Sequence, residues 1–399
     1  MASQSQHHEL HNHRRQLTDM RIFYFLSFFA IGGLFPLLSV YLQNEVGLRG
    51  SQIGVIMSIG PVMMLIAQPI WGLISDYTRS PRILLAISVT GTGAIGLMYV
   101  TAEVYPVLIF IAAFLALFQA AMIPLSDSMV MNYVHKKGGD YGRIRLWGAA
   151  GFALAVWVMG NLSDWFGQSI IFYAFAVVLW ISAWFALKMP RESQVVRVDL
   201  KKGLRRLIVV PKFVLFLIAT FLVFGPIMAN NFYFGLLIQF AGGSLAGVGL
   251  AFLLAAGSEI PFMRWAGSLI SKQGVTVILF LAALVSGFRW LFYFLGPSPE
   301  LIYVTTVIQG LSIGLFIPAA LQYVRSLAPE EVKATAVSLY AAVGNGLGAW
   351  FFTFFAGIIM DWQNILYVYL FYGVLTLCGA AVLIVIMNLE KKEGAPVDA

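Results

Sequence analysis

Long runs of apolar residues, rather than alternating apolar and polar positions, dominate this chain. A helix needs about 20 mostly apolar residues to cross a bilayer. Twelve stretches meet this requirement, and Gly or Pro interrupts several of them, as the helices of membrane transporters tolerate. The pattern predicts an all-α membrane protein with twelve transmembrane helices. The predicted helices cover residues 21–43, 52–75, 82–101, 105–133, 144–164, 168–187, 211–240, 245–270, 275–295, 300–326, 334–361 and 364–388.

The composition excludes a soluble globular protein. Sixty per cent of the residues are hydrophobic, 11% are charged and the mean hydropathy is +0.85, whereas soluble domains are about 45–50% apolar and about 25% charged. The single cysteine, Cys378, excludes a disulfide framework. The sequence contains no G-x-x-x-x-G-K-[ST] loop, so ATP-driven transport is unsupported. The predicted helices hold no metal-ligand cluster and no Ser-His-Asp spacing, and we therefore expect neither an enzyme nor a metal or cofactor site.

The basic residues are distributed unevenly between the predicted loops. Of the 25 Lys and Arg residues, only Arg49 lies in a loop that follows an odd-numbered helix, and Arg289 lies inside a helix. The segment Lys188–Lys212 alone holds eight of them. Because cytoplasmic loops carry the excess of basic residues, both termini and this segment are predicted to lie in the cytoplasm, with the helices in the bacterial inner membrane. Topology and anionic lipid explain the charge, so no nucleic-acid partner is expected.

The two halves of the chain echo each other. The segment Gly160–Trp165, GNLSDW, recurs as GIIMDW at Gly357–Trp362, and Ile123–Val130 aligns with Ile317–Val324, each about 195 residues apart. Parallel six-helix repeats around a site at the membrane midplane are a known transporter architecture. We therefore predict two pseudo-symmetric six-helix bundles. The predicted parts are an N-terminal tail (1–20), a first bundle (21–187), a linker (188–210), a second bundle (211–388) and a C-terminal tail (389–399).

Two acidic residues, Asp127 and Glu259, lie well inside apolar stretches. A carboxylate near the bilayer centre costs at least about 2.5 kcal/mol, so such residues usually have a function. Asp127 aligns with Leu321 in the second half, which indicates that building the fold does not require this acid. Glu259 and Arg289 lie at similar predicted depths on successive helices, and we expect them to form an ion pair. A carboxylate that changes partners during transport can bind and release a proton; the alternative is a static pair that links two helices.

The segment Gly72–Arg82, GLISDYTRSPR, resembles the G-x-L-x-D-R/K-x-G-R/K-R/K signature of the major facilitator superfamily. Ser80 and Pro81 replace the second glycine of that signature. The resemblance covers essentially the whole chain and implies a secondary transporter in which two six-helix bundles rock to expose a site alternately to either side. It also implies gating roles for Gly72, Asp76 and Arg79.

A narrower resemblance links three segments, FFAIGGLFPLLSVYL, GRIRLWGAAGF and SEIPFMRWAGSLI, to the lactose permease, phenylpropionate permease and nucleoside/proton symporter branch. In lactose permease an acid in the fourth helix and an arginine eighteen residues later contact the sugar, and Asp127 and Arg145 match this spacing. Phe28 and Phe152 match two of its aromatic positions. The resemblance thus implies substrate contacts for these four residues, with Asp127 also a candidate for proton coupling.

The second half resembles that permease less closely. Glu259 matches a functional acid in its eighth helix, while Asn230 and Asn231 stand at the depth of acids in its seventh. The tenth predicted helix lacks the His and Glu that couple protons there. We therefore expect Glu259, with Arg289, to carry proton coupling, and the two asparagines to contact substrate.

Together these features predict a proton-coupled symporter that imports a small organic solute such as a sugar, a nucleoside or an aromatic acid. The proton is the coupling ion, membrane lipids and the solute are the partners, and a monomer is expected. The alternative is a proton-driven antiporter that exports drugs or lipids. Such antiporters often carry G-x-x-x-G-P-x-x-G-G in their fifth helix, where this chain has no proline. A membrane sensor that retains a transporter fold is a second, weaker alternative.

Overall fold

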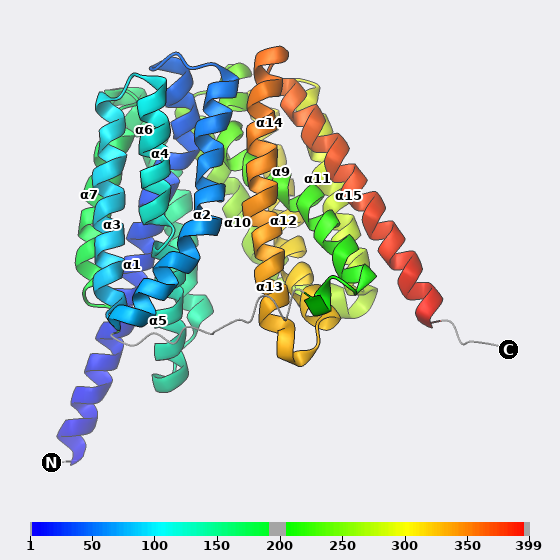
Figure 1. Ribbon diagram of the computed structural model, residues 1–399. Coiled ribbons are helices and arrows are strands. Elements are labelled where there is room, and N and C mark those ends of the chain that lie inside the picture. The colour runs from blue at the N-terminus through cyan, green and yellow to red at the C-terminus, as the bar shows by residue number, and fades with distance from the viewer. Residues whose placement is uncertain (1, 191–204, 395–399) are drawn as a thin grey trace. The chain divides into compact units, whose positions relative to one another are not determined.

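The computed structural model describes residues 2–190 and 205–394, with side chains for 12–190 and 205–392. Within that part of the chain the backbone forms helices joined by short loops and no strands (Figure 1). Among the described residues, eleven helical segments are long and apolar enough to cross a membrane. The sixth predicted span is the shorter apolar helix α7 (Ile170–Ala186). The prediction of an all-α membrane protein is therefore confirmed.

The helices begin and end close to the predicted boundaries. In the first half they are α1 (Ala2–Asn44), α2 (Gly50–Thr78), α3 (Pro81–Leu97), the 3-10 helix η1 (Met98–Thr101), α4 (Tyr105–Gln119), α5 (Met122–Lys137), α6 (Tyr141–Phe166) and α7. In the second half they are α9 (Pro211–Phe240), α10 (Leu245–Gln273), α11 (Val275–Phe294), α12 (Pro299–Leu327), the 3-10 helix η2 (Glu330–Val332), α13 (Lys333–Ala341), the π-helix η3 (Ala342–Gly348), α14 (Ala349–Trp362) and α15 (Ile365–Gly394).

The N-terminal tail does not end where the first span begins. Helix α1 starts at Ala2, so the predicted tail continues the spanning helix without a break. Most of the predicted linker, residues 191–204, lies outside the described residues. The boundaries of the tails and of the linker stay predictions.

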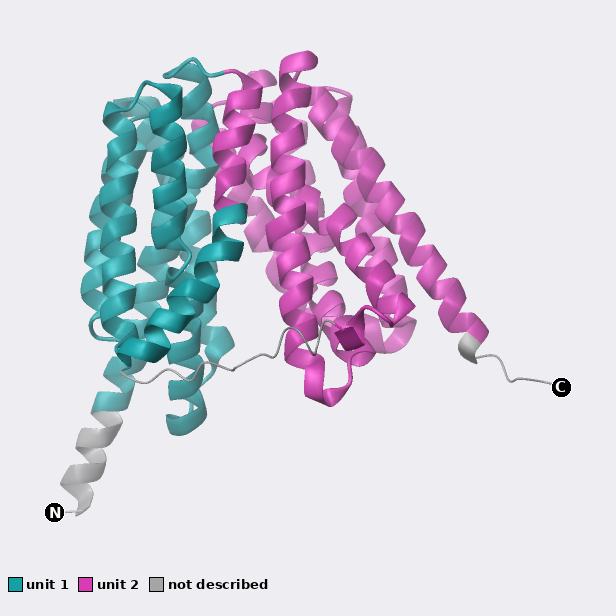
Figure 2. Cartoon of the chain, in the orientation of Figure 1, with its two compact units in different colours: residues 1–48, 62–196 teal, residues 49–61, 197–399 magenta. Residues whose placement is uncertain are grey.

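The chain divides into two compact units, residues 1–48 with 62–196 and residues 49–61 with 197–399 (Figure 2). The first turns of α2 therefore belong to unit 2, although the sequence repeat placed them in the first bundle. Within unit 2, the Asp361 carboxylate accepts hydrogen bonds from the backbone N–H groups of Gly50 (2.5 Å) and Ser51 (2.9 Å). Asp361, the acid of the second G-x-x-x-D-W segment, thus caps the N-terminus of α2, where unpaired N–H groups favour a negative charge.

Helices α1 and α6 pack closely against each other in unit 1. A Cβ placed on Gly32 of α1 would lie 2.5 Å from the carbonyl oxygen of Phe152, and a Cβ on Gly151 of α6 would overlap the carbonyl oxygen of Phe25. Small residues let backbones approach closely in membranes, where packing replaces the hydrophobic effect between helices. This contact fixes the position of α1 relative to α6, and both helices carry candidate site residues.

We expect the substitution Gly151→Ala to destabilise unit 1. The added methyl group meets backbone rather than a mobile side chain, and overpacking of this kind costs about 1–3 kcal/mol. Thermal unfolding of the purified protein measures the loss. Gly257→Ala is the matched control, because a Cβ there has no atom within 4 Å. Equal melting temperatures for the two variants would contradict this description of the contact.

The fourth predicted span is broken in its middle, at Ala120 and Ala121, between α4 and α5. Pro124 has no backbone N–H and cannot continue the hydrogen bond to the carbonyl of Ala120 four residues earlier. Helix α5 therefore starts anew at Met122 inside the span. Broken helices of this kind often mark the binding sites of transporters, and the break lies just before Asp127.

Candidate functional site

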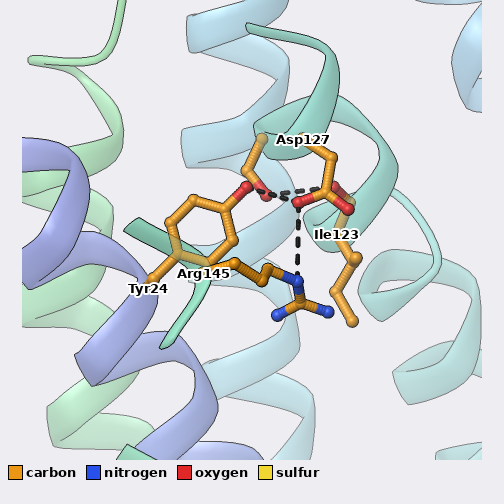
Figure 3. A network of polar contacts seen from close by, with 5 residues as sticks. Tyr24, Ile123, Asp127 and Arg145 are labelled. Carbon is orange, nitrogen blue, oxygen red and sulfur yellow. Dashed lines mark hydrogen bonds and ion pairs between the residues drawn. The ribbon is translucent and has the colours of Figure 1, made fainter. Parts of the chain in front are cut away.

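Asp127 of α5 is the centre of a polar network in unit 1. Its Oδ1 atom accepts a hydrogen bond from the Tyr24 hydroxyl of α1 and lies 3.9 Å from Nε of Arg145 of α6. Figure 3 shows both groups approaching the same carboxylate. The Asp127 side chain is 25% exposed and that of Arg145 33% exposed. The structure therefore brings together Asp127 and Arg145, the two residues whose spacing matched that of the permease, and both side chains remain partly accessible.

Two aromatic rings of α1 cover the guanidinium group of Arg145. The Arg145 Cζ atom lies 4.2 Å from the ring centre of Phe28 and 5.5 Å from that of Tyr24. The two rings are stacked, with an interplanar angle of 7°. Cations bind favourably to aromatic faces at these distances. Phe28 therefore lies beside Arg145, and its contact with substrate stays a prediction.

Phe152 lies two turns after Arg145 on α6, and its backbone packs against Gly32. The side chain is partly exposed. Its role in substrate binding stays a prediction.

Glu259 of α10 is held by its backbone against a small-residue surface of α12. A Cβ on Gly310 would lie 2.7 Å from the Glu259 nitrogen, and one on Gly314 would lie 3.0 Å from its carbonyl oxygen. The side chain is partly buried. Among the described residues, its carboxylate makes no hydrogen bond and no ion pair.

The expected Glu259–Arg289 ion pair is wrong. Arg289, on α11, is 3% exposed and donates through Nη1 to Oε1 of Gln309 at 2.6 Å. Its Cζ lies 3.9 Å from the ring centre of Trp290, and its Nε has no partner in the described part of the chain. Gly310 follows Gln309 on α12, and it packs against the backbone of Glu259 on the side of α12 that faces α10. Glu259 and Arg289 lie at similar levels, since they contact the neighbouring residues 310 and 309 of α12. The level of a residue does not determine which way its helix is rotated, and the guanidinium group of Arg289 contacts Gln309 instead of Glu259.

The two asparagines of α9 have different surroundings. Asn230 is fully buried, and its Oδ1 accepts a hydrogen bond from the Tyr369 hydroxyl of α15 at 2.9 Å. Its Nδ2 has no partner within the described residues. Asn231 is partly exposed. Of this pair, Asn231 is the better placed to meet a solute, while Asn230 belongs to the interior of unit 2.

The residues expected to act as a gate lie at the cytoplasmic end predicted for α2. Asp76 and Arg79 are exposed, and the described part of the chain contains no ion pair for either. Arg79 has a positive φ of 51° and donates its backbone N–H to the carbonyl of Ser75 at 3.0 Å, so it ends the helix. A Cβ on Gly72 would meet no atom within 4 Å. Gating by these residues stays a prediction.

Sequence reasoning missed three partners. Tyr24 stands four residues before Phe28, on the same face of α1, and this spacing could have revealed it. Tyr369 and Gln309 carry no comparable signal, because their contacts with Asn230 and Arg289 depend on how α15 and α12 pack.

The network around Asp127 combines complementary chemical groups. A carboxylate accepts hydrogen bonds, a guanidinium donates up to five in a fixed plane, and aromatic faces cover apolar surfaces. A solute that has hydroxyl groups on its edge and C–H groups on its face can use all three.

Comparison with known proteins gives the family. The model of the MFS_1 like family matches residues 17–371. The maltose permease of Geobacillus stearothermophilus is 50% identical over 378 residues, which are 94% of this chain and 96% of that protein. The uncharacterized transporter YwbF of Bacillus subtilis (strain 168) is 44% identical over 381 residues, 95% of this chain and 96% of that protein.

A solved structure supports the same fold. The crystal structure of the nucleoside transporter NupG superposes with a TM-score of 0.83 at 16% identity, over 93% of this chain and 99% of that one. Together, the helices, the Asp127 network and these relatives identify the chain. It belongs to the MFS_1 like family and is a multi-pass membrane transporter of the major facilitator superfamily.

Proposed function

We propose that this protein imports a disaccharide of the maltose class together with protons across the bacterial inner membrane. Two features support the substrate. The first is the 50% identity to a protein named maltose permease, over nearly the whole of both chains. The second is the chemistry of the Asp127 network, which suits a molecule with many hydroxyl groups.

The observation that carries this proposal is the meeting of Asp127, Arg145 and two aromatic rings in unit 1. Sugar hydroxyls both donate and accept, so one pyranose ring can donate to Asp127 and accept from Arg145. The apolar face of the ring can stack on Phe28. Hydrogen bonds to charged partners contribute about 1.5–3 kcal/mol each, which makes the carboxylate and the guanidinium the main determinants of affinity.

Proton coupling is assigned to Glu259. Its carboxylate is partly buried and has no partner among the described residues, so it can gain or lose a proton without breaking an ion pair. Arg289 is bound to Gln309 and covered by Trp290. We assign Arg289 the role of a fixed positive charge in the interior of unit 2, which favours the ionised form of a nearby carboxyl group. It is not a direct ion-pair partner of Glu259.

The remaining features of the proposal concern the transport cycle. Both termini lie in the cytoplasm, as the distribution of Lys and Arg indicates. The site opens alternately to either side, Gly72, Asp76 and Arg79 take part in gating, and the protein works as a monomer in contact with membrane lipids. The alternative is proton-driven export. Measuring the direction of transport distinguishes export from import.

Uptake in whole cells tests the substrate. Cells that lack their own maltose uptake are given this protein, and accumulation of radiolabelled maltose is compared with that in cells carrying the empty vector. We expect accumulation that excess unlabelled maltose abolishes and that xanthosine and 3-phenylpropionate leave unchanged. If the cells take up no maltose, or if either competitor blocks uptake as well as maltose does, the substrate assignment is wrong.

A further inference from the structure

A polar cavity lies in unit 1, apart from the Asp127 network. It has a volume of 610 Å³ and is bordered by α1, α3, α5 and the residues that follow α7. Pockets of about 300–1,000 Å³ are typical for small-molecule ligands. None of the residues assigned above to substrate, coupling or gating lines it.

The charge of this cavity is strongly positive. Five basic side chains and one acidic side chain line it, which are Arg15, Arg82, Lys136, Lys137, Lys188 and Asp19. Among the described residues, Arg15, Arg82 and Lys137 make no ion pair. The preference for basic residues on the cytoplasmic side explains their number, but not their collection around one hollow. Like charges that share a cavity repel one another, and a polyvalent anion would relieve this repulsion.

The walls of the cavity are tied together by side chains of α1. The Gln16 amide donates to the Lys188 carbonyl at 3.2 Å, which joins α1 to the end of α7. His13 and the Tyr133 hydroxyl are hydrogen-bonded at 2.9 Å, and their rings are stacked, which joins α1 to α5. The cations are therefore carried by connected helices. A site whose walls are held in place loses less entropy when a ligand binds.

We propose that this cavity binds a phosphate-bearing anion at the cytoplasmic face. Arginine pairs with phosphate through two parallel N–H···O bonds, and lysine adds a compact charge. Arg15 and Arg82 supply the first kind of contact, and Lys136, Lys137 and Lys188 the second. The volume exceeds that of a bare phosphate ion and accommodates a phosphate monoester or the headgroup of an anionic lipid. The proposal does not depend on the identity of the transported solute.

Thermal unfolding in an uncharged detergent tests the site. A ligand that binds only the folded protein raises the melting temperature in a saturable way. The probe is sodium phosphate at pH 7, compared with sodium chloride at equal ionic strength. We expect phosphate to stabilise the wild-type protein, and the double variant Arg15→Gln/Lys137→Gln to need about tenfold more phosphate for the half-maximal effect, since it lacks two charged contacts. Both replaced side chains are exposed, so the fold should tolerate their loss.

Lys272→Gln/Arg325→Gln is the matched control. It removes the same charge from exposed positions of unit 2 and should respond to phosphate as the wild type does. Arg82→Gln is a second variant, for use if the first does not fold. Nanodiscs of phosphatidylcholine with or without phosphatidylglycerol form the other arm. Stabilisation by phosphatidylglycerol alone, lost in the same variants, assigns the site to a lipid headgroup.

The proposal is overturned in either of two cases. The first is that neither phosphate nor phosphatidylglycerol stabilises the protein in a saturable way. The second is that the control variant loses the effect as fully as the cavity variants, which would indicate attraction by net charge alone.

Discussion

Replacing Asp127 by asparagine is expected to weaken maltose binding by about 10- to 100-fold. The substitution keeps the shape of the side chain but removes the charge that meets both the Tyr24 hydroxyl and Arg145. A hydrogen bond to a charged partner contributes about 1.5–3 kcal/mol, which corresponds to this range. Binding of radiolabelled maltose to the purified protein measures the effect, and uptake in cells should fall with it.

A double-mutant cycle distinguishes the coupling between Asp127 and Arg145 from the effect of each residue alone. Arg145→Gln alone should also weaken binding, and the double variant should lose less than the sum of the single losses, because residues in one network are coupled. Asp140 and Arg143 provide the matched control. They form an exposed ion pair with an N···O distance of 3.4 Å at the N-terminus of α6, the helix that carries Arg145, and Asp140→Asn should leave binding unchanged. If the Asp127→Asn variant binds maltose with wild-type affinity, the Asp127 network is not part of the substrate site.

Replacing Glu259 by glutamine is expected to abolish proton-driven accumulation of maltose while exchange of maltose across the membrane continues. An amide keeps the size and hydrogen-bonding capacity of the side chain but binds no proton in the physiological range. Because Glu259 has no ion-pair partner among the described residues, the substitution leaves no uncompensated charge behind. Proteoliposomes with an imposed proton gradient measure accumulation, and the same vesicles preloaded with maltose measure exchange.

The control for this prediction is Glu300→Gln, which replaces an exposed acid in the first turn of α12. It should accumulate maltose as the wild type does. Undiminished accumulation by the Glu259→Gln variant would show that another group carries the proton. Loss of both accumulation and exchange would indicate that Glu259 serves substrate binding or folding instead.

The apolar pattern was sufficient to predict the helices, because the length of an apolar run is set directly by the thickness of the bilayer. The predicted span 211–240 coincides with α9, and the other spans shift by a few residues, apart from α1, which continues into the tail. The break at Ala120 follows from Pro124 but was not predicted, since helices of transporters often contain proline without breaking. Residues 49–61 pack in unit 2, a detail that no repeat in the sequence records.

The candidate site was predictable where spacing determines geometry. Asp127 and Arg145 meet because α5 and α6 are joined by a short loop, so a fixed number of residues brings the two side chains to the same level. Glu259 and Arg289 are also on successive helices, yet they do not meet. Their separation depends on how α10 and α11 are rotated about their axes and on the contact of Arg289 with Gln309 of α12. The sequences of α10 and α11 alone indicate neither.

The coupling of maltose to protons is the central claim, and one measurement tests it most directly. Maltose is added outside proteoliposomes that contain the wild-type protein and a trapped pH indicator. No proton gradient is imposed, and potassium with valinomycin holds the membrane potential at zero. We predict that the interior becomes acidic as labelled maltose enters, and that Glu259→Gln vesicles show no such change. Maltose uptake without acidification would indicate uncoupled transport, and alkalinisation of the interior would indicate exchange against protons; either result would contradict the proposal.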